Sequence, residues 1–179
     1  MTSGLPEIQL SSVVGPLSQL PGAETKISSD TLWTTSPVVV LALRRPGWEK
    51  KPQFDELGVN LVCLLHENLP EEVKEYQEFW PGPLYLDNDQ VFFKALGGGK
   101  VRRGSLLTFL NPCSVVWSHA KRSQQSVAKS NLKGDGLTMG GLFVLNGTKV
   151  QYYFREETFG VHAPLDDVLT AARAVSSKI

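Results

Sequence analysis

The stretch VVVLALRRPG (Val38–Gly47), followed by WEKKPQFDELGVNLVCLLHE (Trp48–Glu67), decides the fold of this chain. Val38–Leu43 is apolar and rich in β-branched residues, a pattern typical of a strand buried on both faces of a sheet. The Pro-Gly pair after it predicts a tight turn. A second apolar run, Val59–Leu65, predicts a neighbouring buried strand. The two strands are therefore joined by a short crossover.

Helices and further strands are predicted on both sides of this pair. In chain order they are a strand over Glu7–Val14, a helical turn capped by Asp30 and ending at Trp33, a crossover helix over Gln53–Leu57, a helix over Glu71–Trp80, a strand over Leu84–Leu86, a helix over Gln90–Leu96, strands over Leu142–Leu145 and Val150–Phe154, and a helix over Pro164–Val175. The loop up to Asp30 and the polar stretch Lys100–Gly136 lack a regular pattern. Asn146-Gly147 predicts a type I′ hairpin turn.

This order predicts a single α/β domain with a central mixed sheet and helices on both faces. Residues 1–36 would form an N-terminal strand and loop region, and residues 37–179 the main domain. A parallel crossover usually needs a dozen or more residues. Arg44–Gly58 offers about fifteen, interrupted by Pro46, Gly47 and Pro52, so we expect the crossover to close but to cover little of the sheet.

The composition excludes several classes of protein. The 179 residues suit one domain with a sizeable core. Lys plus Arg (18) equals Asp plus Glu (18), and this balance gives no general attraction for nucleic acid. No apolar run approaches the ~20 residues of a membrane span. Two cysteines are too few for a disulfide framework and favour a reducing, cytoplasmic location.

Four segments together resemble peroxiredoxin-like proteins of the AhpC/TSA antioxidant group, in the branch that includes prostamide/prostaglandin F synthase. They are VVVLALRRPG, PGPLYLDNDQVFFKALGGGK, KGDGLTMGGLFVLNG and REETFGVHAPLDDVL, in that order along the chain. The resemblance implies a thioredoxin-like fold and thiol-dependent reduction of a peroxide or a lipid endoperoxide. It also implies thioredoxin or a similar reductant as partner.

The chain departs from that family where the chemistry resides. Arg44, Arg45, Pro46 and Gly47 form the retained frame of the active turn, but Trp48 follows where the family has a C-x-x-C pair and a long helix. A thiolate is the nucleophile in such chemistry, so no position inherits the catalytic role. Our hypothesis is a shortened variant with a truncated first crossover, arising from altered splicing or a gene-model error. Sequencing the transcript across this junction tests it.

The two cysteines differ in their expected roles. Cys63 lies in the middle of a buried strand, so we expect a small core hydrophobe. Cys113 follows Pro112 in the weakly patterned region and is the only candidate for a substitute nucleophile. The strand position of Cys63 and a reducing compartment disfavour a disulfide between them.

The histidines do not form a metal motif. His66, His119 and His162 are far apart in the sequence and lack the usual ligand spacing, so we predict no metal and no cofactor. His66 follows a buried strand beside Glu67, at the sheet edge where ligands often sit in open α/β folds. A satisfied polar residue at the strand end is the favoured interpretation.

The glycine-rich stretch Gly97–Lys100, with Arg102 and Arg103 after it, ends a predicted helix instead of preceding one. It therefore predicts a helix stop and a basic loop, not a phosphate-binding loop. A second glycine cluster, Gly134 to Gly141, predicts turns before the hairpin.

Two functions remain open on the sequence. One is a thiol oxidoreductase of the peroxiredoxin-like type in which Cys113 has taken over. The other is a catalytically silent thioredoxin-fold module that binds or regulates a partner.

Overall fold

The computed structural model describes residues 7–22, 24–42, 51–80, 82–105, 134–158 and 161–176. Its elements, in chain order, are η1 (Leu10–Val13), β1 (Pro16–Gln19), β2 (Lys26–Ser28), α1 (Thr31–Thr34), β3 (Val38–Ala42), α2 (Lys51–Glu56), β4 (Asn60–Leu65), α3 (Pro70–Phe79), β5 (Leu84–Asp87), α4 (Val91–Leu96), β6 (Gly141–Leu145), β7 (Val150–Arg155) and α7 (Leu165–Val175). Among the described residues, no helix is long and apolar enough to span a bilayer.

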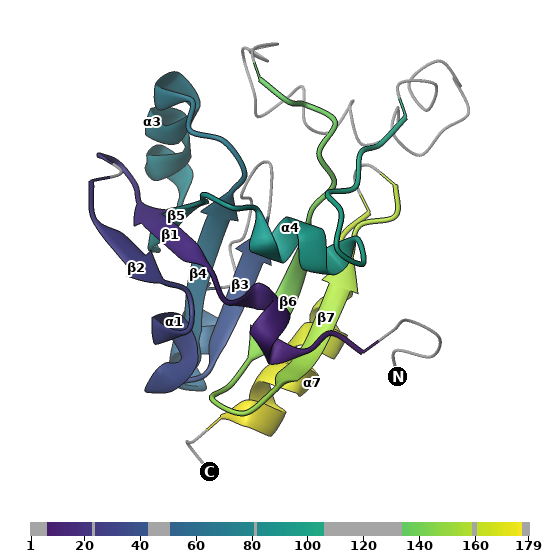
Figure 1. The fold of residues 1–179 in the computed structure, drawn as a ribbon. Helices are drawn as coiled ribbons and strands as arrows, with labels where there is room; N and C mark the ends of the chain where they lie inside the picture. The colour runs from purple at the N-terminus through teal and green to yellow at the C-terminus, as the bar shows by residue number, and fades with distance from the viewer. Residues whose placement is uncertain are drawn as a thin grey trace.

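The strands form one seven-stranded mixed sheet in the order β2-β1-β5-β4-β3-β6-β7 (Figure 1). β3, β4 and β5 run parallel to one another. β6 is antiparallel to β3, with Gly141 opposite Ala42, and β7 is antiparallel to β6. On the other side, β1 pairs antiparallel with β5 and with β2. The predicted mixed sheet, with parallel strands in the first half of the chain and an antiparallel hairpin in the second, is confirmed. The first half also contributes the antiparallel pair β1–β2, which the sequence did not predict.

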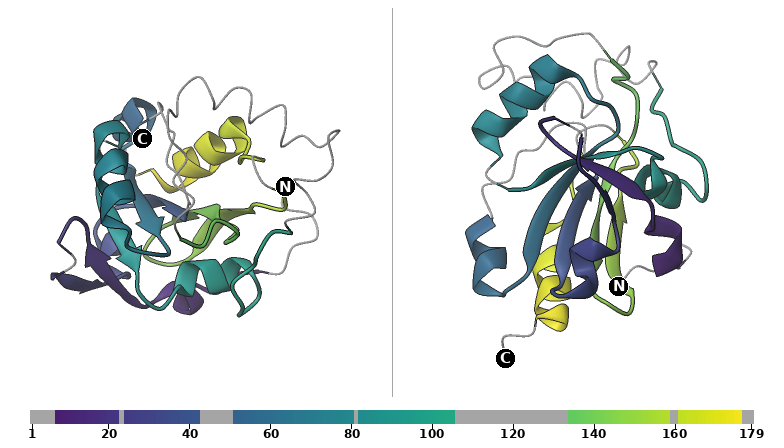
Figure 2. Two further views of the ribbon diagram at one scale, coloured as in Figure 1. Left: turned by 90° about the horizontal axis from the view of Figure 1, so that it is seen from above. Right: turned by 60° about the vertical axis from the view of Figure 1, so that its left-hand side comes forward.

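Alternate residues of the central strands face two separate cores, because successive side chains of a strand point to opposite faces. One core contains Val39, Leu41 and Cys63, and residues of α2, α3 and α7 cover it. The other contains Val38, Val40 and Phe143, and residues of η1, α1 and α4 cover it. The view from above in Figure 2 separates these layers, with α7 on one side of the sheet and α4 with η1 on the other. Helices on both faces are therefore confirmed.

The crossover helix α2 differs in its bounds from the predicted Gln53–Leu57. It begins at Lys51. Pro52 is tolerated in the first turn because the N–H that proline lacks would have no hydrogen-bond partner within the helix there. Lys51 Nζ also bonds the Asp55 carboxylate at 2.7 Å, one helical turn later. Phe54 is fully buried against β4 and the neighbouring core.

Three local predictions are wrong. Glu7–Val14 is not a strand: it contains the 3-10 helix η1. The stretch predicted as a loop up to Asp30 contains β1 and β2. β1 pairs with β2 and with β5, and no local sequence pattern predicts this pairing. Asp30 does precede α1, but its side chain makes no cap hydrogen bond.

The hairpin is confirmed, but its predicted type I′ turn is wrong. That turn requires positive φ at both central residues. Neither Asn146 nor Gly147 has one. The connection spans Asn146 to Lys149, and the register shifts by a bulge beside Leu145.

Candidate functional site

The parallel strands β3, β4 and β5 end at one edge of the sheet, the edge at which open α/β folds bind ligands. His66 and Glu67 follow β4 there, and Asp87 closes β5. The region also receives two segments from far along the chain, residues 101–105 and 134–140. Five residues from these sources form what we call the strand-end cluster: His66, Glu67, Arg103, Asp135 and Thr138.

His66 is buried at this edge and, within the part of the chain that the structure describes, the expectation of a satisfied polar residue holds for its Nε2 but not for its Nδ1. Its Nε2 lies 3.2 Å from the main-chain oxygen of Asp135 and 3.3 Å from Glu67 Oε1. Since both neighbours are acceptors, we assign the ring proton to Nε2. The ring also packs edge-on against Phe93, with centroids 5.6 Å apart.

The other ring nitrogen, Nδ1, is buried and has no hydrogen-bond partner among the described residues. A small cavity of about 10 Å³ adjoins the ring and is lined by Leu65, Leu69 and Val73 with Glu72 and Tyr76. That volume is at the lower limit for a single water. The cavity is therefore too small for an organic substrate.

Asp135 is the centre of the strand-end cluster. Its main-chain N donates to both carboxylate oxygens of Glu67, at 2.9 and 3.2 Å. Its carboxylate pairs with Arg103, accepts from Thr138 Oγ1 at 2.9 Å and accepts from the Leu137 N–H at 3.1 Å. Burial raises the pKa of Asp135, but the hydrogen bonds from these donors outweigh burial and hold its pKa below the ordinary value.

The cluster holds residues 103–104 and 134–138 against each other and against the end of β4. Arg103 and Thr138 form a β-bridge, and the Gly104 N–H donates to Leu137 O at 2.8 Å. Gly134, with φ of +94°, brings the chain so close that a Cβ would collide with the carboxylate of Glu67. The sequence placed this glycine in a turn, but it did not show that Asp135 would contact a strand end 68 residues away.

The basic loop after α4 is confirmed as a helix stop. Gly97 caps α4, and Gly98 and Gly99 have positive φ. Arg102 donates to Glu156 O at 2.8 Å and to Glu157 Oε2 at 2.6 Å. With Arg103 paired to Asp135 as well, both arginines of this loop form ion pairs with acidic side chains.

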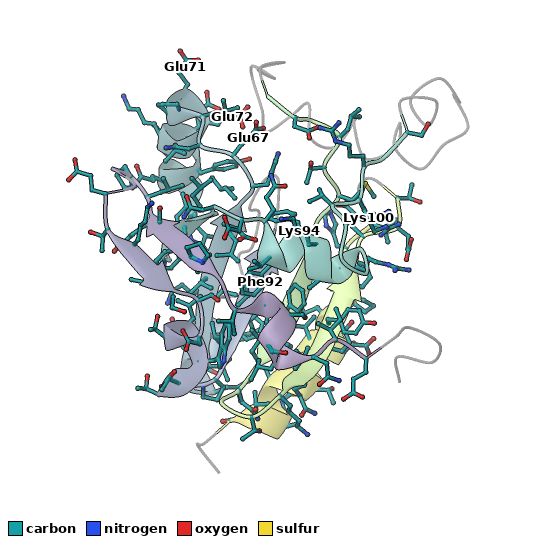
Figure 3. All side chains as sticks on the ribbon, viewed as in Figure 1. Glu67, Glu71, Glu72, Phe92, Lys94 and Lys100 are labelled. Carbon is teal, nitrogen blue, oxygen red and sulfur yellow. The ribbon has the colours of Figure 1, made fainter. Side chains whose placement is uncertain are left out.

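Charge is divided across this edge of the molecule. Figure 3 shows Glu67, Glu71 and Glu72 gathered beside the start of α3, whereas Lys94 and Lys100 lie toward α4 and the loop after it. Glu71 and Glu72 occupy the first turn of α3, where acidic side chains favour the helix dipole.

Asp87 is a buried carboxylate that the sequence did not single out. It is 0% exposed, and its two oxygens accept from the Val91 and Phe92 N–H groups, each at 3.0 Å. Burial raises the pKa of Asp87 to about 6, although the two N–H donors oppose the shift. Beside it, Gln90 has φ of 53° and donates from Nε2 to His66 O at 3.2 Å.

Cys63 is the cysteine that the structure describes, and it cannot act as a surface thiol. It is 0% exposed in the middle of β4, between Leu41 of β3 and Leu84 of β5. Burial raises the pKa of its thiol far above the ordinary value. The predicted core role is therefore confirmed.

Several predicted residues cannot be placed. The turn frame Arg44, Arg45, Pro46 and Gly47, the substitute candidate Cys113, and His119 lie outside the described residues. His162 is exposed and distant in sequence from His66. Within the described ranges, no group of three His, Cys, Asp or Glu side chains is arranged to hold a metal ion.

Comparison with known proteins gives a consistent result. Residues 48–158 match the family described as AhpC/TSA antioxidant enzyme. Peroxiredoxin-like 2A of Danio rerio is 32% identical over 177 residues, which cover 89% of this chain and 78% of that protein. Peroxiredoxin-like 2A of Xenopus laevis is 34% identical over 160 residues, covering 82% and 68%.

Solved structures show the same fold. Peroxiredoxin Q of Xanthomonas campestris superposes with a TM-score of 0.55 at 16% identity, covering 95% of this chain and 97% of that one. Peroxidoxin BcpB of Mycobacterium tuberculosis gives a TM-score of 0.54 at 20% identity, covering 92% and 94%. The expected α/β thioredoxin-like fold is thereby confirmed.

Proposed function

Since this chain belongs to the AhpC/TSA antioxidant enzyme family, we propose that it is a thioredoxin-fold member whose thiol-dependent peroxide reduction is impaired. The observation that carries the proposal is the position of Cys63, fully buried between two strands of the central sheet. The sequence has one other cysteine, Cys113, and no C-x-x-C pair.

The chemistry of a thiol peroxidase explains why this position matters. A thiolate attacks one peroxide oxygen, the O–O bond breaks, an S–O bond forms, and the other oxygen leaves as water or an alcohol. The sulfur must therefore be ionised and within reach of the peroxide. Burial keeps Cys63 protonated and allows no peroxide to approach it.

The partners follow from the family and are proposals for this chain. A thioredoxin-type reductant and a peroxide or lipid peroxide would be the redox partners of any activity that persists. Cys113 is then the sulfur that would carry it. We also propose a cytoplasmic location, because two cysteines without a disulfide framework suit a reducing compartment.

Peroxide consumption coupled to thioredoxin, thioredoxin reductase and NADPH tests the proposal. We expect no turnover above the background without the chain, and no change in the Cys113→Ser or Cys63→Ala variants. Turnover that disappears in Cys113→Ser and persists in Cys63→Ala would show that Cys113 has replaced the missing pair.

A second candidate function is a catalytically silent binding or regulatory module. It is favoured by a groove of about 320 Å³ between the turn after β1 and helix α3, which Asn68, Lys74 and Gln77 line with Val73 at its floor. Insertion of a C-x-x-C segment after Gly47 separates the two candidates. Turnover gained by a folded insertion variant favours the impaired enzyme, whereas a folded variant without turnover favours the binding module.

A further inference from the structure

The connection between β6 and β7 contains Asn146-Gly147, the only asparagine in the sequence that glycine follows. It plays no part in the strand-end cluster or in the proposed redox chemistry. We propose that this pair is a site of spontaneous covalent modification, in which Asn146 forms a succinimide with Gly147 and then becomes aspartate or isoaspartate. Three features of the loop support this: the donors around the Asn146 oxygen, the free approach of the Gly147 nitrogen, and exposure to water.

The side-chain oxygen of Asn146 is held by three hydrogen-bond donors. The Thr148 N–H donates at 3.1 Å, Thr148 Oγ1 at 2.9 Å and the Lys149 N–H at 3.0 Å. When a nucleophile attacks Cγ, negative charge develops on this same oxygen. Donors about 2.7–3.1 Å from such an oxygen stabilise the tetrahedral intermediate of acyl transfer. The loop thus places an oxyanion-stabilising arrangement on an amide next to glycine.

The attacking group is the main-chain nitrogen of Gly147. Within residues 134–158, the structure gives its N–H no acceptor, and Gly147 is exposed. Asp135-Gly136 provides a contrast, because there the Gly136 N–H donates to Gly134 O at 3.1 Å and the Asp135 carboxylate is bound on both oxygens. The second pair is therefore held against the analogous ring closure, in which the carboxyl group would lose water.

The proposed reaction is balanced with water as the only co-reactant. The Gly147 nitrogen loses its proton and bonds to Asn146 Cγ, and the bond from Cγ to Nδ2 breaks as Nδ2 gains a proton and leaves as ammonia. Water then opens the ring. Cleavage of the new bond gives aspartate, and cleavage of the original peptide bond gives isoaspartate, in which the main chain runs through the side chain.

Either product adds a negative charge to the hairpin, and isoaspartate also lengthens the main chain between two paired strands. Because this connection joins β6 to β7, which pair with each other, a longer connection would change the register of that pair. The modification is thus a lasting chemical change in a structural hairpin.

Two substitutions test the geometry in the full-length chain. Gly147→Ala is sterically tolerated, because its Cβ would meet only Trp33 O, at 3.7 Å. The added carbon restricts the main chain and shields its nitrogen, so we expect modification to slow roughly tenfold. Thr148→Val removes one of three donors, and we expect a slowing of roughly tenfold, less than the ~100-fold typical of a donor in a water-excluded enzyme site. Thr148→Ser keeps the hydroxyl and is the matched control.

The measurement is peptide mass spectrometry of the native chain incubated at mildly alkaline pH. The tryptic peptide ending at Lys149 reports the amide-to-acid mass gain, and fragment ions place it at residue 146. We expect Asn146 to be modified faster than every other asparagine. The folded Thr148→Ser variant should be modified at the same rate as the unsubstituted chain. Equal rates at Asn146 and the other asparagines, an unchanged rate in Gly147→Ala, or a faster rate in Thr148→Val would each overturn the proposal.

Discussion

Replacement of Asp87 by asparagine should change how the stability of the protein depends on pH. Asp87 is fully buried, and its folded-state pKa of about 6 lies above the ordinary value of 3.8. A carboxyl group with a raised folded pKa stabilises the fold when protonated. Its contribution is complete below the ordinary pKa and is lost as the pH rises through the folded pKa.

The magnitude follows from these two values. A pKa difference of about 2 units corresponds to roughly 3 kcal/mol between the acidic and alkaline limits. Most of this change falls between the two pKa values, so the free energy of unfolding should rise by about 1 kcal/mol from this group between pH 7 and pH 5. Asparagine cannot titrate, although its oxygen can still accept from the Val91 or Phe92 N–H.

Urea unfolding of both proteins at a series of pH values measures the effect. The difference between the two unfolding free energies reports mainly the titration of Asp87, because this carboxyl group is the one that the substitution removes. That difference should move in favour of the unsubstituted protein on acidification through pH 6. A flat difference, or one that moves the other way, would show that Asp87 is not the desolvated carboxylate that the structure indicates.

Three further predictions concern the crossover and the strand-end cluster. Phe54→Ala should lower the unfolding free energy by about 3–5 kcal/mol, because it empties the core beneath the short helix α2; Phe54→Leu, the control, should cost much less in the same urea titration. Gly134→Ala should lower the melting temperature more than Gly98→Ala, since both glycines have positive φ but only Gly134 would place a Cβ against Glu67; equal shifts would contradict the close approach. The pKa of Asp135 is lowered in the fold, so its contribution is present above its ordinary pKa and is lost as the pH falls through the lower folded value; Asp135→Asn should therefore flatten the acid limb of the pH–stability curve and leave the slope above pH 5 unchanged.

The central strands were predictable because burial on both faces leaves a clear signal. Val38–Ala42 and Asn60–Leu65 are almost entirely apolar. Each run is too short for a typical helix and adjoins a turn signal in the sequence, so a strand is the better prediction. β1 and β2 left no such signal, because short strands near the sheet edge are defined by their partners in space and not by their own sequence. The Asn-Gly pair indicates the hairpin correctly, but the connection spans Asn146 to Lys149 and the register shifts beside Leu145, so the two-residue type I′ turn does not form.

The candidate site was predictable only in part, for a similar reason. His66 could be placed because a polar residue directly after a buried strand must lie at the sheet edge. Its contacts with Asp135 depend on how the chain returns after 69 residues, and no local pattern encodes that return. The glycines on both sides of Asp135 are the available signal, and by themselves they indicate only turns.

Our central proposal is that this member of the AhpC/TSA antioxidant enzyme family holds no reactive sulfur in its sheet. Its most direct test is a peptide-resolved measurement of sulfenic acid formed at Cys63 after a peroxide pulse that leaves the protein folded. The account predicts no trapped sulfenic acid at Cys63 in the native chain and reaction only after unfolding. Rapid sulfenic acid formation at Cys63 in the folded protein would contradict it.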